Sequence, residues 1–448
     1  MTFRKSQDLL GLQGPPRPIR VVIVTSRDAG GGAPRALYRV FSCLRKFEAD
    51  AVSVSMRVVH KSHDESEIVG GKPARSRWEN LVYLARTRYR KYFPRKPFVT
   101  SNKALHAPAL YPTGLGREIN RMDVDVVLVG WLGNSTLSVE EIGRIRKPVV
   151  FRLSDMWVFC GAEHYTTSRR YVHGYSKASR PQDEEGPDIN RETFRRKRRS
   201  WKNPSHIVAL SKWQAKEAQL STLTANWPIT TIPVPVDPSF WRPGSKHEAR
   251  TFFGIPKNSI VLLFGAGSGR KRSEKGGDLF LDSLPLIRDL HHKSGDRRPL
   301  YVALFGEEGP AINHDGIPVH RLGHLGDADL VQAYSATDVF IVPSRLEAFG
   351  QVAAEAQMCG RPVVAFRDTG LADVVENRKT GRLADQMSAD DLAHCVWWTV
   401  EELERNEDLG KEARLRAEKI WNPETVAAQY RSVFERALRG QAQPNPAS

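Results

Sequence analysis

The chain has 448 residues, of which 40% are hydrophobic and 26% charged, a composition typical of globular proteins with room for two domains. Its formal net charge of +16 favours polyanionic partners such as anionic lipid, phosphorylated substrates or nucleic acid. No apolar run approaches the roughly 18–20 residues that cross a bilayer, and the N-terminal residues lack the apolar segment of a signal peptide. Four scattered cysteines form neither a metal-binding pattern nor a disulfide framework, so we expect a cytoplasmic, reduced protein.

The first half of the chain alternates short apolar runs with segments of helical spacing. Residues 1–19 are rich in proline and glycine and are expected to be loose. Strands are then predicted at 21–26, 51–56, 124–130, 148–153 and 206–210, and helices at 33–46, 138–146 and 212–220. Residues 166–190, long and charged, look like a mobile loop. The alternation predicts a doubly wound parallel sheet over residues 20–230.

A second series of the same kind follows a segment with four prolines, residues 230–244, which we interpret as an interdomain linker. Strands are predicted at 260–264, 301–305, 339–342 and 363–366, and helices at 278–290, 329–335, 351–358 and 423–438. The chain is therefore expected to be an α/β protein with a second doubly wound domain over residues 231–420.

Two stretches concentrate the positive charge. Residues 86–96 (RTRYRKYFPRK) interleave basic and aromatic side chains, and residues 195–202 (RRKRRSWK) are denser. Such segments suit an anionic membrane surface, and they also suit solvated helix faces. No recognised nucleic-acid-binding module accompanies them, so we expect no nucleic-acid partner.

The most informative stretch is VFIVPSRLEAFGQVAAEAQMCGRPVVAF, residues 339–366. It predicts a buried strand, a loop, a helix and a second buried strand, with the loop at the carboxyl end of a strand, where ligands bind in open α/β sheets. Glu347 precedes the helix and Glu355 lies about one turn inside it. The backbone N–H groups near Phe349, Gly350 and Gln351 lack helical acceptors and suit a phosphate.

This run resembles the E-x7-E signature of retaining glycosyltransferases of family 4, which have the GT-B fold. The resemblance implies two Rossmann-like domains facing a central cleft, with a final helix (421–440) that returns to the first domain. It also implies that Glu347 contacts the donor sugar and Glu355 the ribose of a nucleotide-sugar. Main-chain contacts to the base are expected near Leu325. The alternative is that both glutamates are solvated surface charges.

A glycine-rich loop with several cations, residues 265–276, follows the strand at 260–264. In the resembled family this loop supplies an arginine and a lysine to the donor diphosphate, and Lys275 and Arg270 fit that pattern, with Arg272 as a rival to Arg270. Fixed cations are needed because negative charge develops on the leaving diphosphate. No acidic D-x-D pair stands at a strand end, so we expect neither a metal nor a cofactor.

Two first-domain motifs extend the resemblance. The backbone of Gly31 and Gly32, after the first strand, resembles a glycine-rich loop that meets acceptor or donor phosphate, although a purely structural tight turn would also explain it. Residues 151–165 (FRLSDMWVFCGAEHY) resemble an exopolysaccharide, colanic-acid-type branch. Asp155 and His164 are the candidates for orienting the acceptor hydroxyl, and a capping aspartate and a packed histidine are the alternatives. The chain departs from that branch at Gly130, where a histidine is common.

The sequence therefore predicts a retaining, metal-independent glycosyltransferase in bacterial cell-surface polysaccharide assembly. Glu347, Lys275 and Asp155 are its expected catalytic residues. A UDP- or GDP-sugar is the expected donor and a glycan or lipid-linked molecule the acceptor, with the protein peripheral on the cytoplasmic face of the membrane. Competing hypotheses are a GT-B epimerase or phosphorylase, and a catalytically silent scaffold on the membrane.

Overall fold

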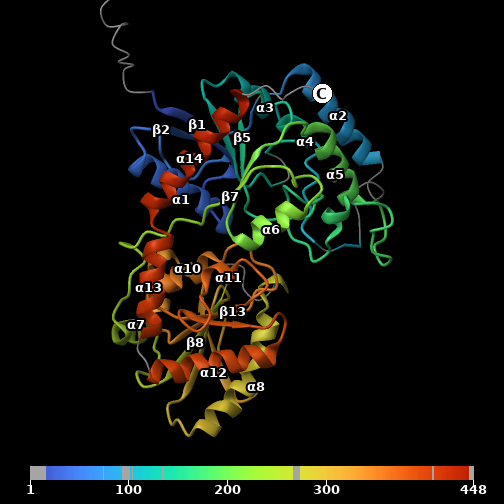
Figure 1. Cartoon of the computed structure of the whole chain (residues 1–448). Coiled ribbons are helices and arrows are strands. Elements are labelled where there is room, and N and C mark those ends of the chain that lie inside the picture. Colours follow the sequence, from blue (N-terminus) through green and yellow to red (C-terminus); the bar gives the residue numbers. More distant parts are fainter. Residues whose placement is uncertain are drawn as a thin grey trace, which may run out of the picture.

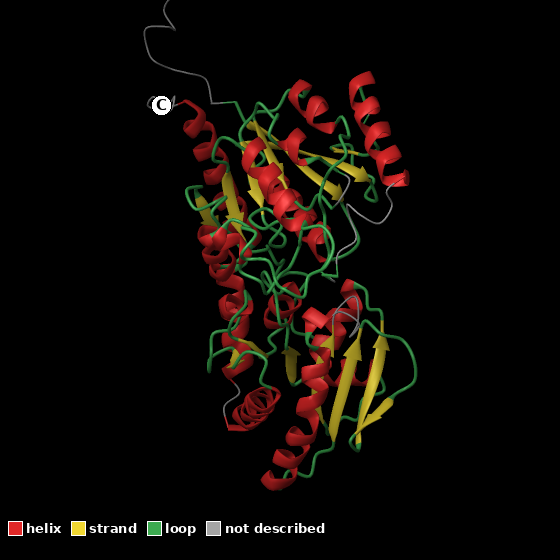
Figure 2. Ribbon diagram, turned by 90° about the vertical axis from the view of Figure 1, so that its right-hand side faces the viewer, coloured by secondary structure: helices red, strands yellow, loops and turns green. Residues whose placement is uncertain are grey.

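The computed structural model describes residues 17–73, 75–92, 101–102, 104–133, 136–265, 273–405 and 408–442. They form two α/β units, one above the other in Figure 1, each built on a seven-stranded sheet. The strands and the helices that cover them are also visible from the side in Figure 2. The predicted pair of doubly wound, mainly parallel sheets is confirmed.

The first sheet has the strand order β3-β2-β1-β4-β5-β6-β7, and its pairings are parallel. Its strands are β1 (Ile19–Arg27), β2 (Val52–His60), β3 (Ile68–Val69), β4 (Val126–Val129), β5 (Val149–Arg152), β6 (His206–Ala209) and β7 (Ile229–Thr231). The inner strands are continuous apolar runs because helices cover both faces of the sheet. The strand order reverses between β1 and β4, so this domain's ligand-binding crevice is expected at the carboxyl ends of those strands.

Three helices of the first domain begin at side chains that cap them. Ser138, Asp188 and Ser211 each accept a hydrogen bond from the backbone N–H three residues later. The helices are α1 (Gly32–Phe47), α2 (Arg77–Tyr92), α3 (Leu115–Arg121), α4 (Val139–Ile142), the short 3-10 helix η1 (Arg170–His173), α5 (Ile189–Ser200) and α6 (Lys212–Leu220). Within the described residues, no helix of either domain is long and apolar enough to cross a membrane.

The second sheet repeats the arrangement, with the order β10-β11-β9-β8-β12-β13-β14 and one antiparallel pair, β10 with β11. Its strands are β8 (Ile260–Gly265), β9 (Leu300–Phe305), β10 (Ile312–His314), β11 (Ile317–Gly323), β12 (Val339–Val342), β13 (Val363–Phe366) and β14 (Gly381–Ala384). Here the order reverses between β8 and β12. The loops after these two strands carry the predicted donor residues.

The second domain has its own set of helices, listed here in chain order. They are α7 (Lys246–Phe252), the 3-10 helix η3 (Ser273–Lys275), α8 (Gly277–Ser294), α9 (Asp327–Ala336), α10 (Gln351–Met358), α11 (Leu371–Val374), α12 (Ala389–Arg405) and α13 (Asp408–Ile420). The observed α10 has the bounds that the sequence predicted. Its last residues turn at Cys359, and Pro362 prevents the helix from continuing.

The last helix, α14 (Pro423–Ala442), leaves the second domain and packs against the first (Figure 1). Val426, Tyr430 and Phe434 are buried in one apolar cluster with residues of β1, α1 and β2. Contacts also run the other way, since Ala36 of α1 is buried in the core cluster of the second domain. The two domains are therefore joined by apolar packing as well as by the chain between them.

Three local predictions differ from the structure. The segment 166–190 contains η1, and its Tyr171 and Tyr175 are buried, because Arg170 pairs with Asp188 at 2.6 Å and closes the segment onto α5. The helix expected at 138–146 shortens to α4, since Gly143 lies against the backbone of Ser200, where no Cβ would fit. The edge strands β3, β7, β10 and β14 were not predicted, because short edge strands carry little apolar pattern, and neither was β11, which lies between β10 and β9.

Candidate active site

The donor-side residues of the second domain converge where the loops after β8 and β12 meet. Lys275, at the end of η3, donates a hydrogen bond from Nζ to Oε2 of Glu347 at 2.6 Å. Gly276 follows with a φ of +66°, and a Cβ there would lie 1.9 Å from the carbonyl oxygen of Pro343. The glycine after Lys275 therefore has a physical reason. Without a side chain, Gly276 lets the loop after β8 touch the loop after β12, and this contact brings Lys275 to Glu347.

The loop after β12 ends at the first turn of α10. Gly350 has a φ of +93°, and its missing side chain leaves room for Leu371. The ring of Phe349 is buried, with its centroid 6.0 Å from that of Trp421, so this residue offers its backbone and not its side chain to a ligand. No side chain caps α10, which leaves the N–H groups of its first turn available to an anion.

The glycine-rich loop of the first domain faces this helix end. Gly31 precedes α1 with a φ of +83° and no capping side chain, so α1 also presents uncapped N–H groups. Gln351 Nε2 donates to the carbonyl oxygen of Gly32 at 2.8 Å, and Figure 1 shows α10 next to α1 at the junction of the domains. Two helix N-termini from different domains therefore approach each other, and both favour negative charge between them.

Glu355 lies in α10 but is only 2% exposed. Its Oε1 accepts a hydrogen bond from Nη2 of Arg39, on α1 of the first domain, at 2.6 Å. The hydroxyl of Tyr334 lies 3.5 Å from Oε2, and burial followed by the charge of Glu355 raises the pKa of Tyr334 well above its usual value. In this structure the carboxylate contacts a first-domain guanidinium at the position where the resemblance implies a ribose.

Arg39 was not identified from the sequence. Its guanidinium carbon lies 5.4 Å from the ring centroid of Trp241, and its buried Nη1 has no hydrogen-bond partner. One turn earlier on α1, Arg35 pairs with Asp327 of α9. The i, i+4 spacing of two arginines just after a glycine-rich turn is the sequence signal that could have found this interdomain contact.

The acceptor-side candidates form a separate pair. Nδ1 of His164 and Oδ2 of Asp155 are 2.6 Å apart, and both residues are buried. The other oxygen of Asp155 accepts the backbone N–H of Trp157 at 2.9 Å, which orients the carboxylate. The ring of Trp131, after β4, lies 6.2 Å from that of His164. An aspartate that holds a histidine in this way can fix which ring nitrogen carries the proton.

A buried lysine binds the backbone of the segment that connects this pair. Lys197 of α5 is 0% exposed and donates from Nζ to the carbonyl oxygens of Trp157, Cys160 and Gly161. Its Nζ lies 3.8 Å from the centroid of the Trp157 ring. Burial lowers the pKa of Lys197 to about 7. The segment between Asp155 and His164 is therefore held by an amine that the sequence analysis had treated as part of a basic surface stretch.

The structure brings some of the predicted residues together and leaves others apart. Lys275 meets Glu347, and Gln351 meets Gly32, whereas no hydrogen bond or ion pair of the described residues joins Asp155 or His164 to these groups. Leu325 follows β11 and packs against the core of the second domain. Arg270 and Arg272 lie outside the described residues.

Two further observations bear on the sequence predictions. A Cβ at Gly130 would lie 1.9 Å from Cδ1 of Leu37, so the histidine that is common in the resembled branch would require Leu37 of α1 to shift. In the described ranges, no three His, Cys, Asp or Glu side chains form a group that could hold a metal ion.

Residues 245–416 match the profile of a family described as "Glycosyl transferases group 1", which covers most of the second domain. A curated relative, "D-inositol 3-phosphate glycosyltransferase 2" of Catenulispora acidiphila, is 34% identical over 225 residues, or 47% of this chain and 51% of the relative. The chain thus spans about half the length of the curated relatives it matches. These relatives are not named as exopolysaccharide enzymes, so the branch suggested by residues 151–165 stays a prediction.

Solved structures agree over almost the whole chain. Anabaena HepE in complex with UDP and glucose superposes with a TM-score of 0.60 at 14% identity, over 93% of this chain and 100% of that one. Sucrose-phosphate synthase from Thermosynechococcus elongatus gives a TM-score of 0.60 at 14% identity, over 94% and 100%. The chain has the GT-B fold, and residues 245–416 of its second domain are similar to the glycosyl transferases group 1 family.

Proposed function

We propose that this protein is a retaining, metal-independent glycosyltransferase that moves a sugar from a nucleotide-sugar to an acceptor bound by the first domain. The observation that carries the proposal is the contact of Lys275 with Glu347 beside the uncapped N-terminus of α10. A lysine, a carboxylate and free backbone N–H groups at one strand end suit a sugar diphosphate, whose phosphates need positive charge and whose sugar hydroxyls need acceptors.

The chain's own residues supply the electrostatics of such a transfer. Cleavage of the sugar–phosphate bond places negative charge on the leaving diphosphate, which Lys275 and the N–H groups of α10 would stabilise. Removing one such donor typically costs about 2.7–4 kcal/mol of barrier. In a front-face mechanism the leaving phosphate oxygen itself takes the proton from the acceptor hydroxyl, while Glu347 binds the sugar and the Asp155–His164 pair orients the acceptor.

Glu355 is proposed to bind the donor ribose through Oε2. A carboxylate offers about four lone-pair positions, and the only bond shorter than 3 Å that it accepts in the described structure, from Arg39, uses Oε1. Because the residue is 2% exposed and pairs with Arg39 of α1, donor binding at Oε2 would require this part of α1 to move away from α10. The interdomain contact would then re-form over the bound nucleotide.

Two acceptor classes are supported by different observations. The motif at residues 151–165 favours a glycan or lipid-linked acceptor of bacterial cell-surface polysaccharide assembly. The names of the curated relatives favour a phosphorylated cyclic polyol. A panel of both classes with the identified donor distinguishes them, since product mass reports which hydroxyl-bearing molecule gained the sugar.

The donor is tested first by thermal shift with UDP-, GDP-, ADP- and CDP-sugars. A donor at a concentration of 100 Kd should stabilise the protein by about 2.7 kcal/mol. Transfer with retained anomeric configuration then tests the reaction, and an acceptor-free assay that releases a new nucleotide-sugar would indicate an epimerase instead. Absence of both binding and turnover with every nucleotide-sugar would leave the phosphorylase and scaffold hypotheses.

Peripheral binding to anionic membranes is also proposed, through α2 at the edge of the first domain (Figure 1). Trp78, Leu81 and Leu84 share one helix face and are 69%, 57% and 61% exposed. In the basic stretch that motivated this prediction, residues 93–96 and the side chains of residues 86, 87 and 89–92 lie outside what the structure describes. Replacing Trp78 and Leu84 by serine should release the protein from anionic vesicles in sedimentation, whereas Leu415→Ser, an exposed leucine of α13, should not.

A further inference from the structure

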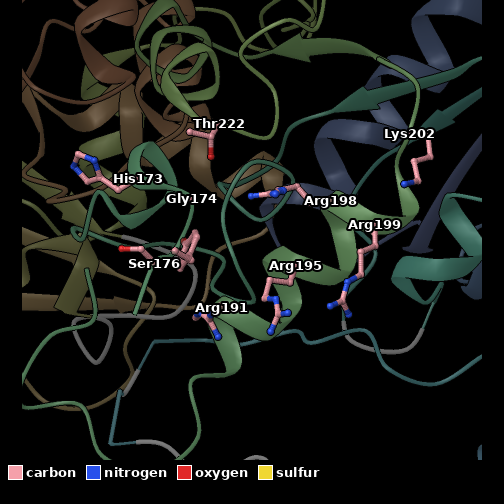
Figure 3. A pocket seen from close by; sticks show the side chains of 10 residues that line it. His173, Gly174, Ser176, Arg191, Arg195, Arg198, Arg199, Lys202 and Thr222 are labelled. Atoms are coloured by element: carbon pink, nitrogen blue, oxygen red, sulfur yellow. The ribbon is translucent and has the colours of Figure 1, made fainter. Parts of the chain in front are cut away.

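A pocket of about 680 Å³ lies on the first domain, between α5 and the segment that follows η1 (Figure 3). Half of the residues that line it are arginine or lysine, and none is aspartate or glutamate. The cations are Arg191, Arg195, Arg198, Arg199 and Lys202. Such an excess of one charge in one concave site attracts an anion.

Four of the five cations come from one side of α5, and Lys202 follows the end of that helix. Arg191, Arg195 and Arg198 are spaced i, i+4 and i+7, so their side chains leave α5 on the same face, about one turn apart. Figure 3 shows these arginines along the helix, with His173, Ser176 and Thr222 around them on other segments. Like charges at this spacing destabilise a helix slightly, and a bound anion would relieve that repulsion.

The basic residues of α5 divide into two sets. Arg196 and Lys197 point inward, where Arg196 pairs with Glu140 at 2.6 Å and Lys197 meets three carbonyl oxygens. On the pocket side, no described residue forms a hydrogen bond or ion pair with the side chains of Arg191, Arg198, Arg199 or Lys202. Arg195 has only a 3.9 Å contact with Glu192, between two exposed groups.

Stabilisation of the helix end does not account for the pocket-side set. Cations in the last turn of a helix interact favourably with its dipole, which explains Arg198 and Arg199. Arg191, however, lies in the first turn, where the dipole disfavours a positive charge. A helix face that was merely solvated would not need residues 173–176 and Thr222 opposite it, which close this pocket.

Both walls are fixed by buried contacts. Arg170 of η1 is 3% exposed and donates two hydrogen bonds, at 3.1 and 2.6 Å, to Asp188, the residue that caps α5. Tyr175 packs on Phe194 of α5 with ring centroids 4.9 Å apart, and its hydroxyl donates to Glu163 at 2.6 Å. The cations are therefore presented by a preformed frame, which lowers the cost of binding.

The size of the cationic row indicates the ligand. A single phosphate can contact one or two neighbouring guanidinium groups, whereas this row extends over more than two helical turns, or about 12 Å at 1.5 Å per residue. Arginine forks match phosphate oxygens in pairs, so successive arginines suit successive phosphates.

We infer that this pocket is a second anion site, which binds a molecule with two or more phosphate groups. It is distinct from the proposed donor site, because α6 lies between the two. That helix begins near the second domain, where the Lys212 N–H donates to Asp373, and Thr222 of the pocket follows its other end. The inference does not depend on the proposed transfer reaction. The phosphates could belong to a lipid headgroup or to a soluble molecule.

Calorimetric titration of the full chain with inorganic pyrophosphate, at about 0.15 M salt, tests the site. The double variant Arg195→Gln/Arg198→Gln should weaken binding by at least about tenfold, because two charge-assisted contacts are lost. The matched control is Arg144→Gln/Arg146→Gln, which removes the same charge from exposed arginines of the first domain outside the pocket. Its affinity should stay within about twofold of the parent.

Lys275→Ala separates this site from the donor site, because a diphosphate bound beside Glu347 would be weakened by that change alone. Pyrophosphate binding that survives in Lys275→Ala and disappears in the pocket variant supports the inference, whatever happens to the proposed function. Equal binding by parent and pocket variant would overturn it. An equal loss in the Arg144/Arg146 control would also overturn it, since net charge alone would then explain the affinity.

Sedimentation with phosphatidylcholine vesicles, with and without cardiolipin, whose headgroup carries two phosphates, identifies the source of the phosphates. Retention of the parent on the acidic vesicles, lost in the pocket variant and reversed by pyrophosphate, assigns the site to a lipid headgroup. Equal retention of parent and pocket variant, with the calorimetric difference intact, assigns it to a soluble phosphorylated molecule.

Discussion

Lys197→Met removes the buried amine behind the Asp155–His164 segment while nearly preserving its volume. In the parent, the ammonium is fully buried, and burial lowers the pKa of Lys197 from 10.5 to about 7. Between these two values the unfolded chain binds a proton that the folded protein does not. The free energy of unfolding of the parent therefore rises as the pH rises through this window.

The expected magnitude follows from the two pKa values. One pKa unit corresponds to about 1.36 kcal/mol, and the folded group is still partly protonated near pH 7. From pH 7 to pH 9 the parent should gain about 2 kcal/mol of stability from this residue, a gain that Lys197→Met cannot show. At every pH the variant also leaves the carbonyl oxygens of Trp157, Cys160 and Gly161 without the amine, at about 1–3 kcal/mol for each unsatisfied group.

Urea unfolding at several pH values, followed by tryptophan fluorescence, measures this difference. Trp157 and Trp201 report on the site because their ring centroids lie 3.8 and 5.5 Å from Nζ of Lys197. Lys216→Met, at an exposed lysine of α6, is the matched control and should follow the parent. Parallel pH dependences for parent and Lys197→Met between pH 7 and 9 would show that the amine keeps its proton in the fold, which would refute the reasoning.

Three further expectations concern the donor side. Lys275→Ala should lower turnover by about 10²–10³-fold, and it should change stability by less than about 1 kcal/mol because the pair of Lys275 with Glu347 is partly exposed. The control Lys293→Ala, at an exposed lysine, should change neither turnover nor stability. A Lys275→Ala enzyme with unimpaired turnover would contradict the assigned role. EDTA should leave initial rates unchanged, and loss of activity that magnesium restores would show that a metal takes part. Glu355→Gln should weaken donor binding in thermal-shift titrations, and it should lower stability by about 3–5 kcal/mol because Arg39 loses its carboxylate partner. Adding Arg39→Met to this variant should recover stability but not donor affinity. Recovery of both would argue against ribose binding by Glu355.

Much of the fold could be predicted because its determinants are local. Continuous apolar runs bounded by glycine and proline located β8, β12 and β13, and the bounds of α10 and α6 agreed with the structure. Edge strands and the short α4 were missed or misjudged, because their pairing and their ends depend on neighbours that are distant in the sequence.

The candidate site divides in the same way. The residues Lys275, Glu347 and Gln351 lie on strand-end loops, where the βα topology alone brings them to one edge of the sheet. Arg39 could not be assigned a partner from the sequence, since Glu355 is 316 residues away and is reached only through the packing of one domain on the other.

The dense basic stretch at 195–202 shows most clearly what a sequence determines. Its composition indicated a strong positive charge, which suited an anionic membrane surface or a solvated helix face. Only the tertiary structure decided that Lys197 lies inside, among carbonyl oxygens, while Arg195 and Arg198 line a pocket closed by residues 173–176 and Thr222. The physical reason is that helical periodicity fixes only how side chains are arranged around the helix axis. Which face of the helix turns toward the core is set by long-range contacts, such as those of Arg170 with Asp188 and of Arg196 with Glu140.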